Sequence, residues 1–124
     1  MICADTSSYI AFINGETERD VELIAQASEY HLLVLAPISV MELLSDPRLT
    51  SSVEELVLET PCLEIKTGYW QRAGKLRGLL MRHGYRPKTA DTLIAQCCLD
   101  DQVPLVTRDR DFLAFRKLTP LRLL

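Results

Sequence analysis

The sequence lacks any apolar run long enough to cross a membrane, so we expect no membrane partner. The first residues do not combine a basic region with a following apolar one, because Asp5 interrupts them at once, and this pattern excludes a secretory signal peptide. Internal repeats, low-complexity tracts and linkers are also missing. We therefore expect the 124 residues to fold as a single cytoplasmic domain, residues 1–124.

Cysteine and histidine are too few and too scattered to indicate a zinc site or a nucleophilic triad. The cysteines are Cys3, Cys62, Cys97 and Cys98. They have neither metal-ligand nor redox spacing, and we interpret them as small buried residues in a reducing cytoplasm. The two histidines, His31 and His83, are single residues at predicted helix ends. Catalysis by a His–Ser or His–Cys pair has no supporting residues.

Acidic residues are missing from one long segment, although the net charge is −3. Residues 1–65 carry 12 acids and 2 bases, and residues 89–124 carry 5 of each. Residues 66–88 carry no acid and seven bases, which are Lys66, Arg72, Lys75, Arg77, Arg82, Arg86 and Lys88. A block of one sign in an otherwise acidic protein predicts a face that binds a polyanion.

Short apolar runs alternate with longer amphipathic segments along the chain, which is 48% hydrophobic. The predicted strands are residues 2–5, 32–36, 62–66, 105–107 and 121–124. The predicted helices are residues 6–13, 16–30, 37–45, 51–59, 67–83, 89–100 and 111–115, with Thr89 as the cap of the sixth. This alternation predicts an α/β fold, a three-layer α/β/α sandwich around a mostly parallel sheet.

Four acids and a close neighbour stand where these predicted elements begin or end. Asp5 closes the first strand, Glu42 lies early in the helix after the second strand, and Asp91 opens an apolar helix. Asp109 follows the strand at 105–107, with Asp111 two residues behind it. Acids gathered at one end of a parallel sheet repel one another, and a hard divalent cation such as Mg²⁺ relieves that repulsion. In such sheets, ligands bind beyond the carboxyl ends of the strands.

Each acid also has a simpler explanation as part of a helix end. Asp5 and Asp109 fit helix caps, and Ser39 with Glu42 fits a capping box. Asp91 fits an early-helix anion favoured by the helix dipole, and Asp111 fits a solvated surface acid. Serine, threonine and asparagine cap equally well, however, and caps need not converge, whereas metal ligands must. The conjunction of acids therefore favours a metal site.

Four segments resemble the signature segments of PIN-domain nucleases. They are Asp5-Thr6-Ser7-Ser8-Tyr9-Ile10-Ala11, Ser39-Val40-Met41-Glu42-Leu43-Leu44, Asp91-Thr92-Leu93-Ile94-Ala95 and Thr107-Arg108-Asp109-Arg110-Asp111-Phe112. Their order and spacing, with the closing residues 118–123, resemble VapC-type toxins of toxin–antitoxin pairs. The resemblance covers nearly the whole chain. No single motif is very specific, but four in order within this length form a strong signal.

The resemblance implies a metal-dependent endoribonuclease that uses one or two Mg²⁺ or Mn²⁺ ions. It implies that Asp5, Glu42, Asp91 and Asp109 form the catalytic quartet and that Asp111 is an auxiliary metal-binding acid. Thr107 and Thr6 would lie near the metal. The implied partners are an RNA substrate, a cognate antitoxin that blocks the active-site groove, and a second copy of the chain. We assign Asp5 and Asp91 as principal ligands and leave Glu42 open as ligand or general base.

The acid-free segment contains the longest predicted helix. Arg72, Lys75 and Arg82 fall within a narrow arc of that helix, and with Arg86 they are our predicted RNA-binding residues. The alternative is an ordinary amphipathic helix with a solvated cationic side. The apolar side is expected to comprise Tyr69, Trp70, Ala73, Leu76 and Leu80. Tyr69, Trp70 and Phe112 are expected in the core, not as base-stacking platforms.

Gly74 and Gly78 are unexpected inside that helix, because each costs about 0.5–1 kcal/mol relative to alanine. We interpret them as sites of close approach by another helix, from a second subunit of a homodimer.

Other acidic-site folds explain fewer of these residues. A receiver domain needs an acidic pair near the first strand, and a haloacid dehalogenase-like phosphatase needs Asp-x-Asp, where this chain has Ser7. A Toprim-like site would use Asp109 and Asp111 but would leave Asp5 and Asp91 unexplained. A non-catalytic RNA- or protein-binding module, with acids that serve only as caps, is the alternative from a different class.

Overall fold

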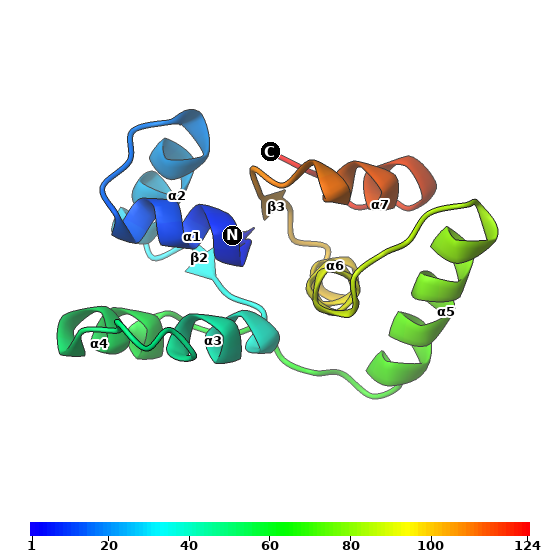
Figure 1. Cartoon of the computed structure of the whole chain (residues 1–124), viewed down its shortest axis with the longest axis horizontal. Coiled ribbons are helices and arrows are strands. Elements are labelled where there is room, and N and C mark those ends of the chain that lie inside the picture. The colour runs from blue at the N-terminus through cyan, green and yellow to red at the C-terminus, as the bar shows by residue number, and fades with distance from the viewer.

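The computed structural model describes all 124 residues, and a small parallel sheet lies at its centre (Figure 1). Its strands are β1 (Ile2–Ala4), β2 (Leu33–Val34) and β3 (Leu105–Val106), in the order β2-β1-β3. Both pairings of β1 are parallel. The first strand of the chain is therefore the central one, and residues that follow β1 and β3 emerge at the same edge.

Seven α-helices and one 3₁₀ turn surround the sheet. They are α1 (Thr6–Ile13), α2 (Arg19–Glu29), α3 (Pro37–Leu44), α4 (Ser51–Glu59), α5 (Tyr69–Arg82), α6 (Thr89–Asp101), η1 (Arg110–Phe112) and α7 (Leu113–Leu118). In Figure 1, α6 is seen end on between α3 and α5, and it contacts both. None of the helices combines the length and the apolar composition that a membrane span requires.

Alternating side chains of the strands divide the core into two halves. Cys3, Val34 and Leu105 belong to the half formed with α5, α6 and α7. Ala4 follows Cys3 and Val106 follows Leu105, and both belong to the half formed with α1 to α4. Successive strand residues point to opposite faces, so short, wholly apolar strands require helices on both sides. The expected three-layer α/β/α fold with a parallel sheet is confirmed.

The two outer strands expected from the sequence are each reduced to an isolated bridge. Leu35 bridges Cys62, and Leu105 bridges Leu123, both in parallel. The predictions of strands at 62–66 and 121–124 were therefore too long. Each of these segments follows a proline and has a ladder neighbour on one side only, which weakens regular pairing. Cys62 is also exposed, contrary to expectation, while the other three cysteines are buried.

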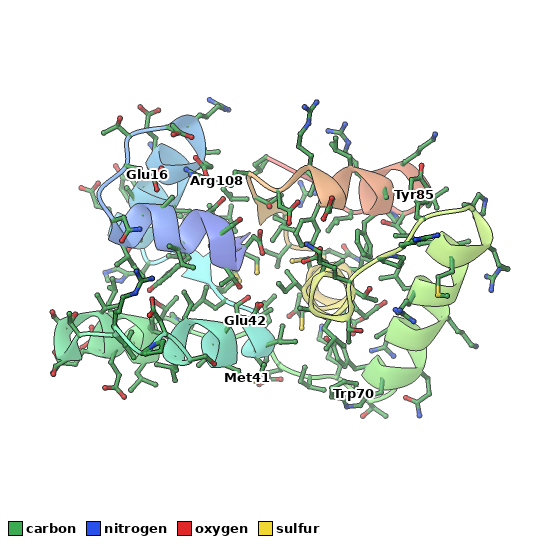
Figure 2. All side chains as sticks on the ribbon, viewed as in Figure 1. Glu16, Met41, Glu42, Trp70, Tyr85 and Arg108 are labelled. Carbon is green, nitrogen blue, oxygen red and sulfur yellow. The ribbon has the colours of Figure 1, made fainter.

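Helix α5 covers α6 with a narrower apolar stripe than expected. Tyr69, Ala73, Leu76 and Leu80 are buried, whereas Trp70 is 65% exposed, so its expected place in the core was wrong. A step of one residue turns the helix by about 100°, which carries Trp70 outside the stripe that spacings of three and four define. Figure 2 shows Trp70 at the lower edge of the molecule, near the start of α5.

The two glycines inside α5 have no packing role within this subunit. A Cβ at Gly74 would meet nothing within 4 Å, and one at Gly78 only the Arg82 guanidinium at 3.3 Å. The expected homodimer therefore stays a prediction.

The start of α5 is held to the end of α6 by one guanidinium. Arg72 donates from Nε and Nη2 to the two carboxylate oxygens of Asp100, at 2.9 and 2.7 Å, and from Nη1 to the carbonyl of Thr67 at 2.8 Å. Gly68 precedes α5 with φ +82°, and a Cβ there would lie 2.7 Å from the same guanidinium. The left-handed backbone favours glycine, and a Cβ there would displace the Arg72 guanidinium. Arg72 therefore has a structural partner in the free protein.

We expect Arg72→Ala to lower the melting temperature, because it leaves the Asp100 carboxylate, whose side chain is 7% exposed, without its cation. Lys75→Ala is the matched control, since it removes an exposed cation of the same helix with no ion pair, and it should melt like the wild type. Differential scanning calorimetry checks both. An unchanged melting temperature for Arg72→Ala would mean that the ion pair adds no stability.

Candidate active site

The predicted acids lie at the edge of the sheet where β1 and β3 end. Asp5 directly follows β1, and Asp109 stands three residues after the end of β3. Asp91 lies in the first turn of α6, and Glu42 lies in α3. The helices α3 and α6 contact each other. The order of the strands thus brings together segments that are far apart in the sequence.

Asp5 is buried, and three hydroxyl and amide groups fix its carboxylate. The backbone N–H of Thr6 donates to Oδ1, and the hydroxyls of Ser7 and Thr107 donate to Oδ2, each at 2.8 Å. Burial raises the pKa of Asp5, and the nearby Asp109 raises it further, while these hydrogen bonds act in the opposite direction. The predicted cap is therefore present, but it is one of three bonds that orient the carboxylate.

Thr6 connects Asp5 to Glu42. Its hydroxyl donates to Oε1 of Glu42 at 2.8 Å, while its N–H binds Asp5. The capping-box explanation of Glu42 is wrong, because Ala36 is the N-cap of α3 and Ser39 already lies within the first turn. The Ser39 hydroxyl is buried without a partner. The helix begins at Pro37, as predicted, and a capping box at Ser39 would require a start two or three residues later.

Asp91, Asp109 and Asp111 are the acids that the structure brings closest together. One carboxylate oxygen from each lies within 4.8 Å of the others. Asp5 and Glu42 stand outside this group of three, although Asp5 is near enough to raise the pKa of Asp91. Asp109 accepts a hydrogen bond from the Asp111 N–H at 2.9 Å, which makes it the cap of η1 as well.

Asp91 carries the strongest sign of unrelieved charge. Its residue is 9% exposed, and Oδ2 is buried with no hydrogen-bond partner. Burial, followed by the charges of Asp109 and Asp5, raises its pKa to about 6. The N-cap of α6 is Lys88, not the predicted Thr89, and it makes no side-chain cap bond. A carboxylate placed only to stabilise a helix end would not be left in this state.

Lys88 supplies a cation at the outer side of the group. Its Nζ lies 3.5 Å from Oδ2 of Asp111, and the carboxylates of Asp111, Asp91 and Asp109 raise the pKa of this lysine. Three clustered carboxylates share this one ion pair. The oxygen-only donor set, its spacing and the orphaned Asp91 oxygen fit a hard divalent cation. Asp91, Asp109 and Asp111 would hold it, with Asp5 beside them.

Arg108 points away from this group although it lies between Thr107 and Asp109 in the sequence. Its guanidinium binds Asp20 at 2.8 Å and Glu16 at 3.1 Å, beside α1 and α2 (Figure 2). This clamp ties the segment after β3 to the start of α2. The helix α2 begins at Arg19, three residues later than the predicted Glu16.

The predicted cationic residues lie in different surroundings. Arg72 is engaged with Asp100, while Lys75 and Arg82 are exposed on α5. Arg86, in the loop between α5 and α6, lines a hollow of about 370 Å³ that also reaches Asp91 and Asp111. Of the four predicted RNA-binding residues, Arg86 is therefore the one that lines the same hollow as Asp91 and Asp111.

A second hollow of about 370 Å³ lies on the other side of the site, between α1, α3 and α4. Glu42 lines it together with apolar residues, which are Ile10, Ile13, Leu43, Leu49 and Val53. The acidic edge therefore lies between a hollow that Glu42 reaches and one that Asp91 and Asp111 reach.

The sequence and fold are both those of a known family. The family model described as "PIN domain" matches residues 2–118, so the chain belongs to the PIN domain family. The resemblance inferred from the four segments is confirmed. Membership in this family sets the Toprim-like alternative aside. Among curated proteins, none matches the sequence significantly.

Solved structures share the whole fold at low sequence identity. A chain in the structure of VapBC2 from Rickettsia felis bound to a promoter DNA fragment superposes with a TM-score of 0.75 and 18% identity, covering 100% of this chain and 98% of that one. A chain of FitAcB from Neisseria gonorrhoeae superposes with a TM-score of 0.72 and 18% identity, and the match covers 100% of this chain and 96% of that one. A chain of VapBC-5 from Mycobacterium tuberculosis, described as a member of a family of toxin–antitoxin systems, superposes with a TM-score of 0.66 and 18% identity. The match covers 99% of this chain and 96% of that one.

Three residues that hold or flank the candidate site were not predicted from the sequence. Ser7 binds Asp5, Lys88 pairs with Asp111, and Arg108 anchors the segment that carries Asp109. Ser7 could have been found as a hydroxyl two residues after the first acid. Lys88 was counted only as part of the basic block, although it lies three residues before Asp91. Arg108 had no signal, because its partners are about 90 residues away in the sequence.

We expect the metal-free protein to lose stability as pH rises, because the pKa of Asp91 is about 6 when folded and 3.8 as its ordinary value. The folded state retains the proton that the unfolded chain loses between these values, so the free energy of unfolding falls from about pH 4 to pH 6 and stays lower above. At about 1.4 kcal/mol per pKa unit, the loss approaches about 3 kcal/mol.

Asp91→Asn should remove this loss and be more stable than the wild type at pH 7.5 in EDTA, as measured by urea unfolding. Asp101→Asn, the same change at the other end of α6 where Lys66 pairs with the carboxylate, is the control. Equal pH dependence in wild type and Asp91→Asn would contradict the assignment.

Proposed function

We propose that this PIN-domain protein is a metal-dependent endoribonuclease that hydrolyses RNA phosphodiester bonds. The observation that carries the proposal is the group of three carboxylates, Asp91, Asp109 and Asp111, within 4.8 Å of one another, with a buried unpaired oxygen on Asp91. Such a group is unfavourable in isolation and becomes favourable when a divalent cation binds. The neighbouring Asp5, which its hydrogen bonds hold in one orientation, would complete the ligand set.

The protein would supply ligands and a proton acceptor. Bound Mg²⁺ or Mn²⁺, as one or two ions, would lower the pKa of a water and stabilise charge on the phosphate. Asp5 and Asp91 would be the principal ligands, and Asp109 would act with Asp111. Glu42 is half-buried and held by Thr6, a position from which its carboxylate would bind a metal or accept a proton from the attacking water. Thr107 would keep Asp5 aligned through its hydrogen bond.

The purified protein should cleave single-stranded RNA with Mg²⁺ or Mn²⁺ and stop in EDTA. Asp5→Asn and Asp91→Asn should each lower the rate by more than about a hundredfold, and Thr107→Ala by about 10- to 100-fold, because it removes a bond that orients a ligand. Gel analysis of labelled RNA measures these rates. Asp101→Asn serves as the control and should cleave normally. Full activity in EDTA would contradict the metal dependence, and full activity in either aspartate variant would contradict the role given to that residue. No cleavage by the wild type with either metal would leave a non-catalytic module as the remaining explanation.

We further propose that the protein is the toxin of a toxin–antitoxin pair and that it restrains translation by cutting RNA in the cytoplasm. Support comes from the fold shared along the full chain with VapBC and FitAB proteins, one of them described as a toxin–antitoxin system. The antitoxin would block the active-site groove. The hollow beside Glu42 has an apolar lining that suits side chains of a protein partner.

Induced expression of the wild-type chain in bacterial cells should arrest growth, and Asp5→Asn should not, because the arrest requires cleavage. Co-expression of the protein encoded by the adjacent reading frame should restore growth and co-purify with the chain. Growth curves and mapping of cleaved RNA ends, with Asp5→Asn as control, test the toxin role. Normal growth during expression of the wild type alone would argue against it.

A further inference from the structure

The hollow on the Asp91 side differs in charge from its counterpart on the Glu42 side. Four cations line it, namely Arg86, Lys88, Arg110 and Lys117. Among these, Lys88 is paired, with Asp111, while the other three are exposed and make no ion pair. The hollow beside Glu42 holds one cation, Arg48, and its guanidinium binds Asp46. A polyanion that reaches the acids is therefore favoured on the Asp91 side and not on the Glu42 side.

An aromatic ring lies within this cationic hollow in a fixed position. Gly84, with φ +86°, ends α5 in a Schellman motif, since its N–H binds the carbonyl of Met81 and the N–H of Tyr85 binds that of Leu80. Tyr85 is half-buried, packs against the core and lines the hollow with Leu80. Figure 2 shows Tyr85 between the end of α5 and α7. The ring is thus held in place before any ligand arrives.

The size and the composition of the hollow both match a nucleotide. Its volume of about 370 Å³ falls within the roughly 300–1,000 Å³ typical of small-ligand sites. Apolar contacts come from Tyr85, Pro87 and Leu113, and cations surround them. Proteins that hold single-stranded nucleic acid combine these two elements, with aromatic rings that stack on bases and cations that neutralise phosphates. A purely solvated cationic surface would need neither the ring nor the hollow.

We infer that this hollow is a nucleotide subsite of the substrate path. It takes a nucleotide of the RNA next to the bond positioned at the acids, with the base against Tyr85 and the adjoining phosphates at Arg86, Arg110 and Lys117. This inference rests on the proposed nuclease function and adds where the strand lies. It gives an RNA-binding role to Arg110, Lys117 and Tyr85. None of the three was predicted to bind RNA from the basic segment at residues 66–88.

Binding of a short single-stranded RNA, measured by fluorescence anisotropy in an Asp5→Asn background that cannot cut it, tests the subsite. Tyr85→Ala should weaken binding about tenfold or more, and Tyr85→Phe should retain it, because stacking needs the ring. Arg110→Ala should weaken binding and reduce the slope of log affinity against log salt by about 0.7, the value for one lost phosphate contact on a single strand. Arg116→Ala, an exposed cation of α7 outside the hollow, is the control and should bind normally.

An RNA backbone without bases separates the two kinds of contact. On that probe, the effect of Tyr85→Ala should vanish and the effect of Arg110→Ala should remain. Circular dichroism of Tyr85→Ala checks that the fold is retained, and Arg110→Ala tests the same site without touching the core. Unchanged RNA binding by both variants would overturn the subsite, as would a loss confined to binding of the antitoxin.

The outcomes separate the subsite from the nuclease proposal. If the protein with Asp5 restored cuts RNA while Tyr85→Ala and Arg110→Ala bind it normally, the subsite alone is refuted. If RNA binds through Tyr85 and Arg110 but is never cut, the subsite holds and the hydrolytic function is refuted.

Discussion

Mutual repulsion of carboxylates at one edge of a small parallel sheet is the constraint on which the rest of the site depends. β1 is central, so Asp5 emerges beside the segment that follows β3 and carries Asp109. α6 then adds Asp91 from its first turn. The protein relieves the repulsion only in part, through hydroxyl donors to Asp5 and one lysine at Asp111. We expect the unpaired oxygen of Asp91 to lower the stability of the metal-free protein, as is common where binding or catalysis requires preformed charge.

The scaffold holds these acids with contacts that are distant in sequence. Arg108 joins the β3 side to the start of α2 through Asp20 and Glu16, and Arg72 joins α5 to the end of α6 through Asp100. Both arginines turn away from the acidic edge, so they position the elements without cancelling the charge of the site. Cations whose side chains are free lie on the rim of the hollow beside Asp91. This division leaves negative charge at the centre, where a metal would bind, and positive charge around it, where a phosphate backbone would lie.

The roles of the acids show why helix capping and metal binding are difficult to separate in a sequence. Asp5 and Asp109 do cap the elements that follow them, so the prediction that these two acids are helix caps is correct. Glu42 and Asp91 cap nothing: Glu42 accepts from Thr6, and Asp91 leaves one oxygen without a partner. A cap uses an oxygen that faces one backbone N–H, and the remaining lone pairs stay available. The same carboxylate can therefore end a helix and hold a cation.

The sequence by itself determined the order of the elements, the parallel α/β class, the PIN resemblance and the acids at the ends of elements. Those features depend on local periodicity, on turn residues and on which residues follow an apolar run. Only the tertiary structure decided that Asp91, Asp109 and Asp111 come closest, that Thr6 links Asp5 to Glu42, that Trp70 is outside the core, and that Tyr85 lies in a cationic hollow. Strand order and helix packing bring these groups together across long stretches of chain, and no pattern within a short window records which distant side chain will be the neighbour.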